Sequence, residues 1–299
     1  MKHRSRIAIG NLPRIANLVV VQPQRNVSLV LNPSKSCRWA SKRGPCKFCG
    51  FWNVGPAGQG MLFEDAIEQL RAGGTTGQVN LLTPGSFLDA AQISERNQER
   101  MVVDTWLELK PRTIRIESRP EHVSLERLGW LAGIIEGTRL EVAIGLETSD
   151  QEKRLGMGKG FTNADFENAV RLIKEAGAYP VTYLLTGFPE ENATGEAAHR
   201  ELVASAGYLE GLAGRVGTAM KIALECFFPN PNNPSEPAAY LTPAFVADAA
   251  MTIVERFGMR IEIATWDEGY GNHRLDAVKS VIDEFNETQD LSHLRRILL

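Results

Sequence analysis

The segment CRWASKRGPCKFCG, residues 37–50, directly follows the first strand that the sequence predicts, Val27–Leu31. It contains three of the four cysteines, Cys37, Cys46 and Cys49, with eight residues between the first two and two between the last two. Thiolates at this spacing can surround one metal centre, and no fourth ligand lies nearby in the sequence. A structural zinc site has four protein ligands, whereas an iron–sulfur cubane on three thiolates leaves one iron open. The segment therefore predicts an iron–sulfur cluster, with a zinc site or packing thiols as alternatives.

The composition is that of an ordinary globular protein, with 43% hydrophobic and 23% charged residues in 299. A chain of this length buries roughly 75% of its unfolded surface, so it needs no metal merely to fold. The net charge of −3 argues against a dedicated nucleic-acid-binding domain. Residues 35–50, the cysteine loop, nevertheless hold only basic charges. They are Lys35, Arg38, Lys42, Arg43 and Lys47. These cations predict a counter-charge for a cluster, a carboxylate or phosphate site, or simply a solvated loop.

The sequence predicts a cytoplasmic protein without membrane contact. No stretch approaches the ~18 uninterrupted apolar residues of a membrane span. The basic start, residues 1–6, is followed by a segment too short and too interrupted for the apolar region of a signal peptide. In a reducing cytosol, clustered cysteines are more often metal ligands or catalysts than disulfides.

Short apolar runs alternate with stretches of helical periodicity, which predicts an α/β fold of βα units around a parallel sheet. The pattern alone does not separate an open sheet from a barrel. Strands are expected at Val27–Leu31, Val79–Thr83, Thr113–Glu117, Leu140–Leu146, Val181–Leu185 and Lys221–Phe227, with a weaker edge strand at Arg260–Ala264. Helices are expected at Ile93–Lys110, Ser124–Gly137, Asn163–Gly177, Thr194–Leu212 and Pro243–Phe257, the third of them capped by Asn163.

We expect one core domain, residues 27–265, because no linker-like change of composition interrupts it. Residues 1–26 form an N-terminal extension, irregular by composition, as is the segment 228–234. Residues 266–299 are expected to form a C-terminal loop followed by one or two packing helices.

Five segments in order along the chain resemble the radical S-adenosylmethionine (radical SAM) superfamily. Besides the cysteine triplet they are TPGSFLD (83–89), IESRPE (116–121), IGLET (144–148) and GKGFT (158–162). The commonest superfamily motif has three residues between its first two cysteines. The eight found here are similar to the branch that contains the elongator catalytic subunit and the radical SAM subunit of archaeosine synthase. The resemblance covers about residues 27–230.

The resemblance implies a partial (β/α)6 barrel, an open TIM-like core with cofactor and substrate at the carboxyl ends of the strands. It also implies a [4Fe–4S] cluster on Cys37, Cys46 and Cys49, whose open iron chelates the amino and carboxylate groups of S-adenosylmethionine. One electron, from a donor such as flavodoxin or ferredoxin, then cleaves the sulfonium to methionine and a 5′-deoxyadenosyl radical.

Cofactor-binding residues follow from the same segments. Gly85 and Ser86 offer open backbone and a hydroxyl to the ammonium end of an amino-acid ligand, although an ordinary turn has the same composition. Glu117 and Glu147, at the ends of successive strands, suit ribose hydroxyls or the methionine ammonium, and Arg119 suits a carboxylate. Each taken singly is more often a salt-bridge residue.

Two further side chains are expected near the cofactor. Lys159, between two glycines, is predicted to extend into the opening at the carboxyl ends of the strands (the mouth) or into solvent. Phe51, two positions after the last cysteine, is predicted to lie near the adenine, or simply to pack.

Two remaining features stay open. Cys226 is most often expected to be a small buried hydrophobe. The alternative places it inside the barrel, where it would hold a sulfur atom or donate hydrogen. Residues 266–274, WDEGYGNHR, are expected to line the substrate side of the mouth or to form a surface turn.

The sequence therefore predicts a radical SAM enzyme that abstracts hydrogen from its substrate. A nucleoside of tRNA and a small biosynthetic metabolite are both compatible with the residues as that substrate. The alternative from another class is a zinc-binding module, without catalysis, that binds RNA or protein.

Overall fold

The computed structural model describes residues 18–21, 26–31, 37–49, 62–73, 77–190, 193–227, 235–264 and 275–299. Eight strands form one sheet in chain order, with β1 antiparallel to β2 and the strands from β2 to β8 parallel. The strands are β1 (Leu18–Val21), β2 (Asn26–Leu31), β3 (Gln78–Leu82), β4 (Thr113–Glu117), β5 (Arg139–Glu147), β6 (Tyr179–Thr186), β7 (Lys221–Cys226) and β8 (Arg260–Ile263).

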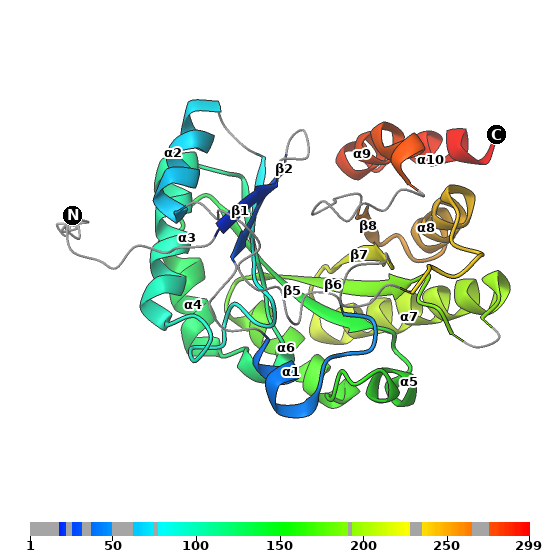
Figure 1. The fold of residues 1–299 in the computed structure, drawn as a ribbon, viewed down its shortest axis with the longest axis horizontal. Helices are drawn as coiled ribbons and strands as arrows, with labels where there is room; N and C mark the ends of the chain where they lie inside the picture. Colours follow the sequence, from blue (N-terminus) through cyan, green and yellow to red (C-terminus); the bar gives the residue numbers. More distant parts are fainter. Residues whose placement is uncertain are drawn as a thin grey trace.

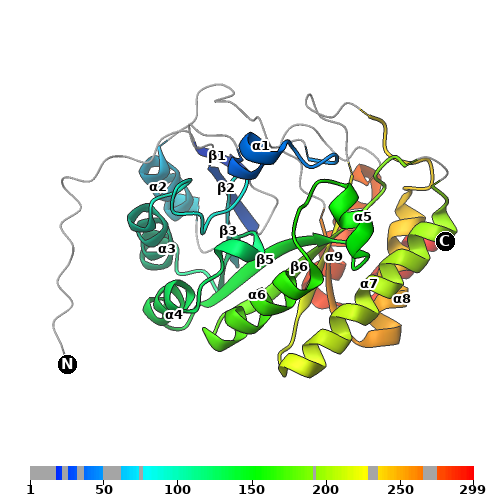
Figure 2. The ribbon, with the colours of Figure 1, turned by 90° about the horizontal axis from the view of Figure 1, so that it is seen from below.

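The sheet curls into a half-barrel that is covered by helices on its outer face (Figure 1). Figure 2 shows α1 and α5 at the end of the molecule to which the parallel strands lead. The helices are α1 (Arg38–Arg43), α2 (Phe63–Gly73), α3 (Glu95–Leu109), η2 (Pro120–His122), α4 (Leu125–Ile134), α5 (Gln151–Gly156), α6 (Asn163–Glu175), α7 (Gly195–Val216), α8 (Pro243–Phe257), η3 (Asp276–Val278), α9 (Lys279–Thr288) and α10 (Leu291–Leu298). No described helix is both long and apolar enough to cross a membrane.

Side chains alternate between the two faces of each strand. In β4, Ile114 and Ile116 are fully buried in the hydrophobic core against the helices. Arg115, between them, faces the interior of the half-barrel, where it lines a large cavity. The alternation of period two therefore makes one face of the sheet apolar and the other polar.

The expected partial barrel is confirmed, and all seven expected parallel strands form. The weaker seventh, Arg260–Ile263, is indeed an edge strand in the described sheet. The five expected helices form with small shifts of their ends, and the C-terminal tail contains two helices, α9 and α10. Thr162 rather than Asn163 caps α6, because its hydroxyl and the Asp165 carboxylate form a reciprocal capping box.

Several elements were not expected. Residues 18–21 form the antiparallel edge strand β1, so the expectation that the first 25 residues are irregular is wrong there. β1 pairs with β2 residue by residue, a long-range contact that composition does not reveal. The short helices α1 and α5 have six residues each, too few for periodicity to show, and α2 was also missed.

Two side chains cover the edge strand β8, one from α9 and one from a residue just after it. Asn286 accepts from the backbone N–H of Ile263 at 2.8 Å and donates to its carbonyl at 2.9 Å. Gln289 makes the same pair of bonds to Ile261, at 3.0 and 2.8 Å. Two amides thus imitate a neighbouring strand and satisfy backbone groups that would otherwise be open for pairing.

We predict that Asn286→Leu lowers the free energy of unfolding by about 1–3 kcal/mol, because it leaves both backbone groups of Ile263 without partners. Chemical denaturation followed by circular dichroism measures the change. The exposed Ser280→Leu on the same helix is the control and is expected to change stability by less than about 0.5 kcal/mol. Equal stability of Asn286→Leu and wild type would contradict the prediction.

Candidate active site at the carboxyl ends of the strands

The cysteine loop lies at the carboxyl ends of the parallel strands. Cys37 precedes α1, and Cys46 and Cys49 lie in the turn that follows it, joined by a backbone hydrogen bond of 3.0 Å between them. All three cysteines are partly buried and none forms a disulfide. Among the described residues, no three His, Cys, Asp or Glu side chains converge closely enough to hold a single metal ion. A cubane cluster does not require its three thiolates to converge on one atom, because each thiolate binds a different iron atom.

The residues that follow α5 form hydrogen bonds with the cysteine loop and hold it in place. The indole N–H of Trp39 donates to the Gly158 carbonyl at 2.8 Å, and the backbone N–H of Lys47 donates to the Met157 carbonyl at 2.9 Å. The Cys46 Sγ lies 3.6 Å from the same Gly158 oxygen. These bonds join segments more than a hundred residues apart and fix where the thiols lie.

Glycines allow the backbones around the thiols to approach closely. Gly85 has φ +107°, and a Cβ there would lie 3.3 Å from the Cys37 Cα and collide with the Gln92 amide. Gly160 has φ +72°, and its missing side chain leaves the space that the Trp39 ring fills. A Cβ on Gly158 would lie 3.6 Å from the Cys46 Cα. The mouth is therefore shaped by backbone, which fits a bulky group bound on the thiols.

Glu147 and Lys159 form a buried ion pair beside the cysteines. Glu147 ends β5 at a register shift, with φ +67°, and its Oε1 lies 2.5 Å from the Lys159 Nζ. The same Nζ lies 5.3 Å from the centroid of the Phe48 ring. Burial lowers the pKa of Lys159, but Glu147 and the Cys46 thiol outweigh this effect and raise it, so the ammonium is charged. It supplies a fixed positive charge next to the thiol cluster.

Burial is the largest influence on Cys46 itself and raises the pKa of its thiol. Lys159 and Arg119 act in the opposite direction and favour the thiolate. Thiolate ligands need such nearby cations because burying a negative charge is costly.

Arg119 connects the other predicted residues. Its backbone N–H donates to the Ser86 hydroxyl at 3.3 Å, and its guanidinium donates to the Lys159 carbonyl at 2.8 Å. The guanidinium also lies 4.0 Å from the centroid of the Trp39 ring and bonds the Glu121 carboxylate at 2.5 Å. These contacts hold the mouth together, and the expectation that Arg119 binds a ligand carboxylate stays a prediction.

A closed network of four charged side chains fills the middle of the half-barrel. The Arg115 guanidinium lies 2.9 Å from Glu141 and 2.6 Å from Glu262, and the Lys221 ammonium lies 2.8 Å from Glu141 and 3.4 Å from Glu262. Burial raises the pKa of Glu262, but Arg115 and Lys221 dominate and lower it to about 2. Two cations thus neutralise two carboxylates.

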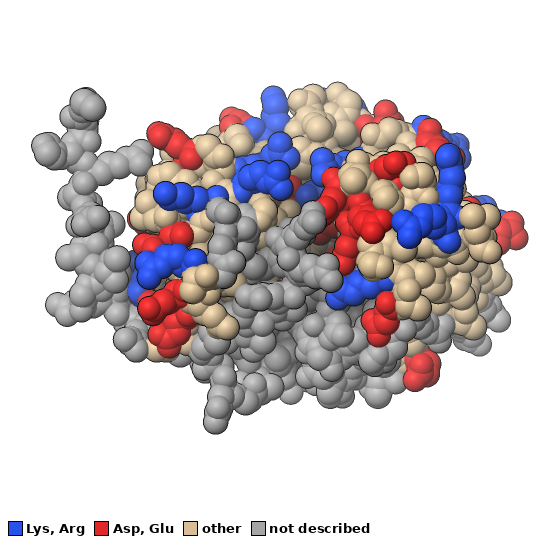
Figure 3. Space-filling model, turned by 90° about the horizontal axis from the view of Figure 1, so that it is seen from above, with Lys and Arg blue, Asp and Glu red and all other residues tan. Residues whose placement is uncertain are grey.

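A cavity of about 1240 Å³ extends along this network and is lined by all four of its members. Figure 3 views the molecule from the side between β2 and β8. Lys and Arg side chains stand next to Asp and Glu side chains there, and neither sign forms a continuous patch on the described part of this face.

Two more carboxylates lie between the network and the mouth. Glu117 accepts a hydrogen bond of 2.7 Å from the Tyr183 hydroxyl. Glu225 lines the cavity and makes no hydrogen bond or ion pair with any residue that the structure describes. Burial, followed by the neighbouring carboxylates Glu117, Glu262 and Glu147, raises the pKa of Glu225 to about 8. At neutral pH this side chain is therefore mostly protonated.

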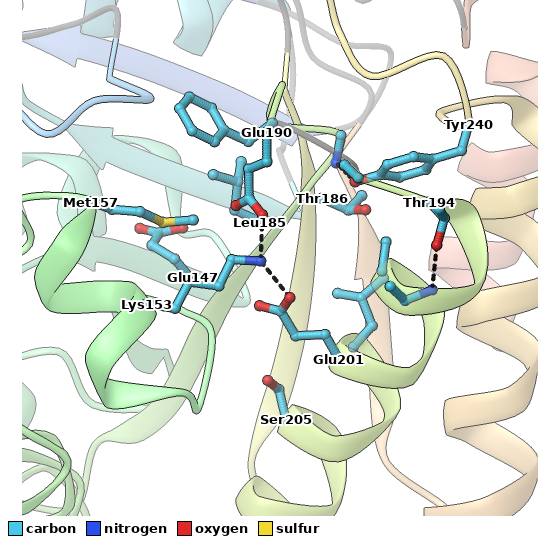
Figure 4. A pocket seen from close by; sticks show the side chains of 16 residues that line it. Glu147, Lys153, Met157, Leu185, Thr186, Glu190, Thr194, Glu201, Ser205 and Tyr240 are labelled. Carbon is cyan, nitrogen blue, oxygen red and sulfur yellow. Dashed lines mark hydrogen bonds and ion pairs between the residues drawn. The ribbon is translucent and has the colours of Figure 1, made fainter.

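A smaller cavity of about 60 Å³ lies between α5 and α7 (Figure 4). Lys153 points across it to Glu190 at 3.0 Å and Glu201 at 2.5 Å. Both carboxylates share the single ammonium of Lys153, so the cavity has no unpaired cation for a ligand among its described residues.

The structure brings most of the predicted site residues together. Cys37, Cys46, Cys49, Gly85, Ser86, Arg119, Glu147 and Lys159 lie around one mouth, and Glu117 lies just beneath it. Phe51, Lys35 and the segment 266–274 lie outside the described residues. Of the basic residues in the loop, Arg38 pairs with Asp89 at 2.6 Å. Cys226 lies in the hydrophobic core and not among the cavity-lining residues, so the alternative that placed it inside the barrel is wrong.

Two features of the site were not expected from the sequence. They are the charged side chains inside the half-barrel and the contact of Trp39 that holds the cysteine loop in place. Arg115 and Glu117 occupy alternate positions of one strand, as do Arg139 and Glu141 of another. Charges at every second residue of an otherwise apolar strand were the signal for a polar barrel interior. Nothing in the sequence marks Trp39.

A profile of the radical SAM superfamily matches residues 31–202, more than half of the chain. The chain belongs to the radical SAM superfamily. It is therefore an enzyme, and members of this superfamily use a [4Fe–4S] cluster and S-adenosylmethionine. The alternative of a non-catalytic zinc-binding module is not favoured.

Two curated relatives are similar to the chain, each described as archaeosine synthase subunit beta. The protein of Methanosarcina acetivorans is 29% identical over 54% of this chain and 48% of its own length. The protein of Thermococcus kodakarensis is 38% identical over 41% of this chain and 38% of its own length. The matched part of this radical SAM chain thus spans about half or less of these relatives.

Solved structures share the fold. Methylornithine synthase superposes with a TM-score of 0.55 and 15% identity over 90% of this chain and 85% of that one. The archaeal Elp3 of Methanocaldococcus infernus superposes with a TM-score of 0.51 and 14% identity, over 77% of this chain and 58% of its own. At such identities the likeness establishes the half-barrel architecture alone.

The raised pKa of Glu225 predicts a pH dependence of stability. The folded protein holds this proton to about pH 8, whereas an unfolded glutamate releases it near pH 4.5. The stabilisation is complete below the unfolded pKa and is lost as the pH rises towards 8. The free energy of unfolding of wild type, relative to Glu225→Gln, is expected to fall by up to about 1.4 kcal/mol per pH unit between about pH 5 and pH 8. Denaturation across this range measures it, and parallel curves for the two proteins would contradict it.

Proposed function

We propose that Cys37, Cys46 and Cys49 hold a [4Fe–4S] cluster and that the mouth around them binds S-adenosylmethionine. The single observation that supports this most is the position of the three thiols, beside the glycine-lined backbone and the buried cation Lys159. The donor set is suitable, because thiolates are the ligands of such clusters. When bound, the cluster supplies the electron that splits S-adenosylmethionine and so generates the 5′-deoxyadenosyl radical that abstracts hydrogen from the substrate.

The residues of the chain then bind and orient the cofactor. The Ser86 hydroxyl, 2.9 Å from the Ser118 hydroxyl, presents a polar group beside the open backbone of Gly85. Glu147 and Glu117 present carboxylates towards ribose hydroxyls or the methionine ammonium. Arg119 positions this set because it joins the Ser86, Lys159 and Trp39 segments. Phe51 remains a candidate partner of the adenine.

We predict that anaerobic reconstitution gives about four irons per chain and 5′-deoxyadenosine that depends on dithionite. Cys46→Ala is expected to lose both, because one thiolate ligand is removed. Cys226→Ala is the matched control, since it removes the one cysteine that lies in the hydrophobic core, and it is expected to retain both. Iron and sulfide analysis and chromatography of the products measure the outcome. Zinc without labile sulfide in the wild type would overturn the proposal.

The proposed substrate class is based on the curated relatives and not on the geometry of the site. The curated relatives are described as subunits of archaeosine synthase, and by analogy we propose a nucleoside of tRNA as the substrate. A small biosynthetic metabolite is the second candidate, favoured by the mixed charges on the described part of the face in Figure 3, which shows no broad basic patch there. The curated relatives are described as subunits, which supports a protein partner for this chain. Flavodoxin or ferredoxin is the proposed electron donor.

If tRNA is the substrate, added tRNA is expected to change the rate of 5′-deoxyadenosine formation and to bind with an affinity that falls steeply with salt. Filter binding between about 50 and 200 mM salt measures the second effect, where six phosphate contacts would cost roughly 10³ in affinity. If no tRNA pool produces either effect, the result would favour a metabolite as the substrate.

A further inference from the structure

Two carboxyl groups inside the half-barrel take no part in its described ion pairs. The network of Arg115, Lys221, Glu141 and Glu262 is neutral, and Glu147 is paired with Lys159. At the amino ends of the strands, the cavity is lined by three arginines, Arg112, Arg139 and Arg260, and by three acids of α9, Asp283, Glu284 and Glu287. The carboxyls of Glu117 and Glu225 belong to none of the described ion pairs.

Of these two, Glu225 has the greater need of a partner. Glu117 has the Tyr183 hydroxyl, whereas Glu225 has no hydrogen-bond or ion-pair partner among the described residues. The groups that act on it are carboxylates from three strands, Glu117, Glu147 and Glu262, together with Arg115, which is already engaged with acids. An ionised carboxylate in such a place is costly unless a cation comes from outside.

The cavity has room for such a ligand. Its volume of about 1240 Å³ is large enough for a small molecule, and Glu225 is the last but one residue of β7. The network lines the same cavity and is neutral as a set. Glu225 lies nearer the carboxyl end of β7 than Lys221, which belongs to the network.

We propose that this cavity binds the substrate through a cationic nitrogen, an alkylammonium or amidinium group, which pairs with the Glu225 carboxylate. The proposal rests on the proposed function, because it assigns the substrate class of the same site.

A proton exchange accompanies such binding. Without ligand, Glu225 is mostly protonated at pH 7, because its pKa is raised to about 8. A cation binds to the ionised form, so the proton must leave. Roughly one proton is therefore released for each cation bound.

Titration calorimetry of the full, cluster-reconstituted chain tests this at pH 7, in buffers of different ionisation enthalpy. The probes are butylammonium and its neutral analogue 1-butanol. We expect butylammonium to bind at least about tenfold more tightly and to release roughly one proton. Glu225→Gln is expected to lose about tenfold in affinity and the proton release. Glu284→Gln, on the same cavity but paired with Arg296 at 3.1 Å, is expected to behave as wild type.

Equal binding of the two probes, or butylammonium binding by wild type without proton release, would overturn the inference whether or not the variant folds. Proton release on addition of S-adenosylmethionine that Glu225→Gln abolishes would assign the carboxyl to the cofactor and overturn it as well. Failure of the proposed function is separate, because it appears in the iron content and 5′-deoxyadenosine formation of the wild type.

Discussion

Alternation of side chains along the parallel strands controls both faces of this half-barrel. The strands place aliphatic residues against the outer helices, and β4 also places a charged residue towards the interior, as Ile114 and Arg115 illustrate. A polar interior is stable only where its charges are paired, and four side chains from four strands provide that pairing around Arg115 and Lys221. The same four side chains line the cavity that we propose as the ligand site.

The mouth depends on a second constraint, the fastening of the cysteine loop. The loop gains its position from Trp39 and from backbone bonds to residues 157–158, and Arg119 stacks on the same indole. Gly160 and Gly85 are required there because a side chain at either would occupy space that the loop fills. Chemistry at the mouth is thus supported by contacts whose members take no part in it.

Much of the architecture follows from local pattern. The near-continuous apolar run of β5 and the capped, amphipathic α6 are visible in the sequence, because burial requires those residues whatever surrounds them. The edge strand β1 is different. Its pairing with β2 is a long-range contact, and a four-residue run has too little periodicity to predict it. The edge strand β8 was expected, but its cover by Asn286 and Gln289 could not be, because it depends on where α9 packs.

The sequence by itself determined the superfamily, the order of the βα units and the thiols available as ligands, because spacing and residue type are properties of the chain. Only the tertiary structure decided that Cys226 belongs to the core, that Arg119 is engaged by its neighbours, and that Glu225 lacks a hydrogen-bond or ion-pair partner among the described residues. Burial and pairing are relations between segments far apart in the sequence. The position of the Glu225 carboxyl inside the half-barrel is therefore visible only when all the strands are in place.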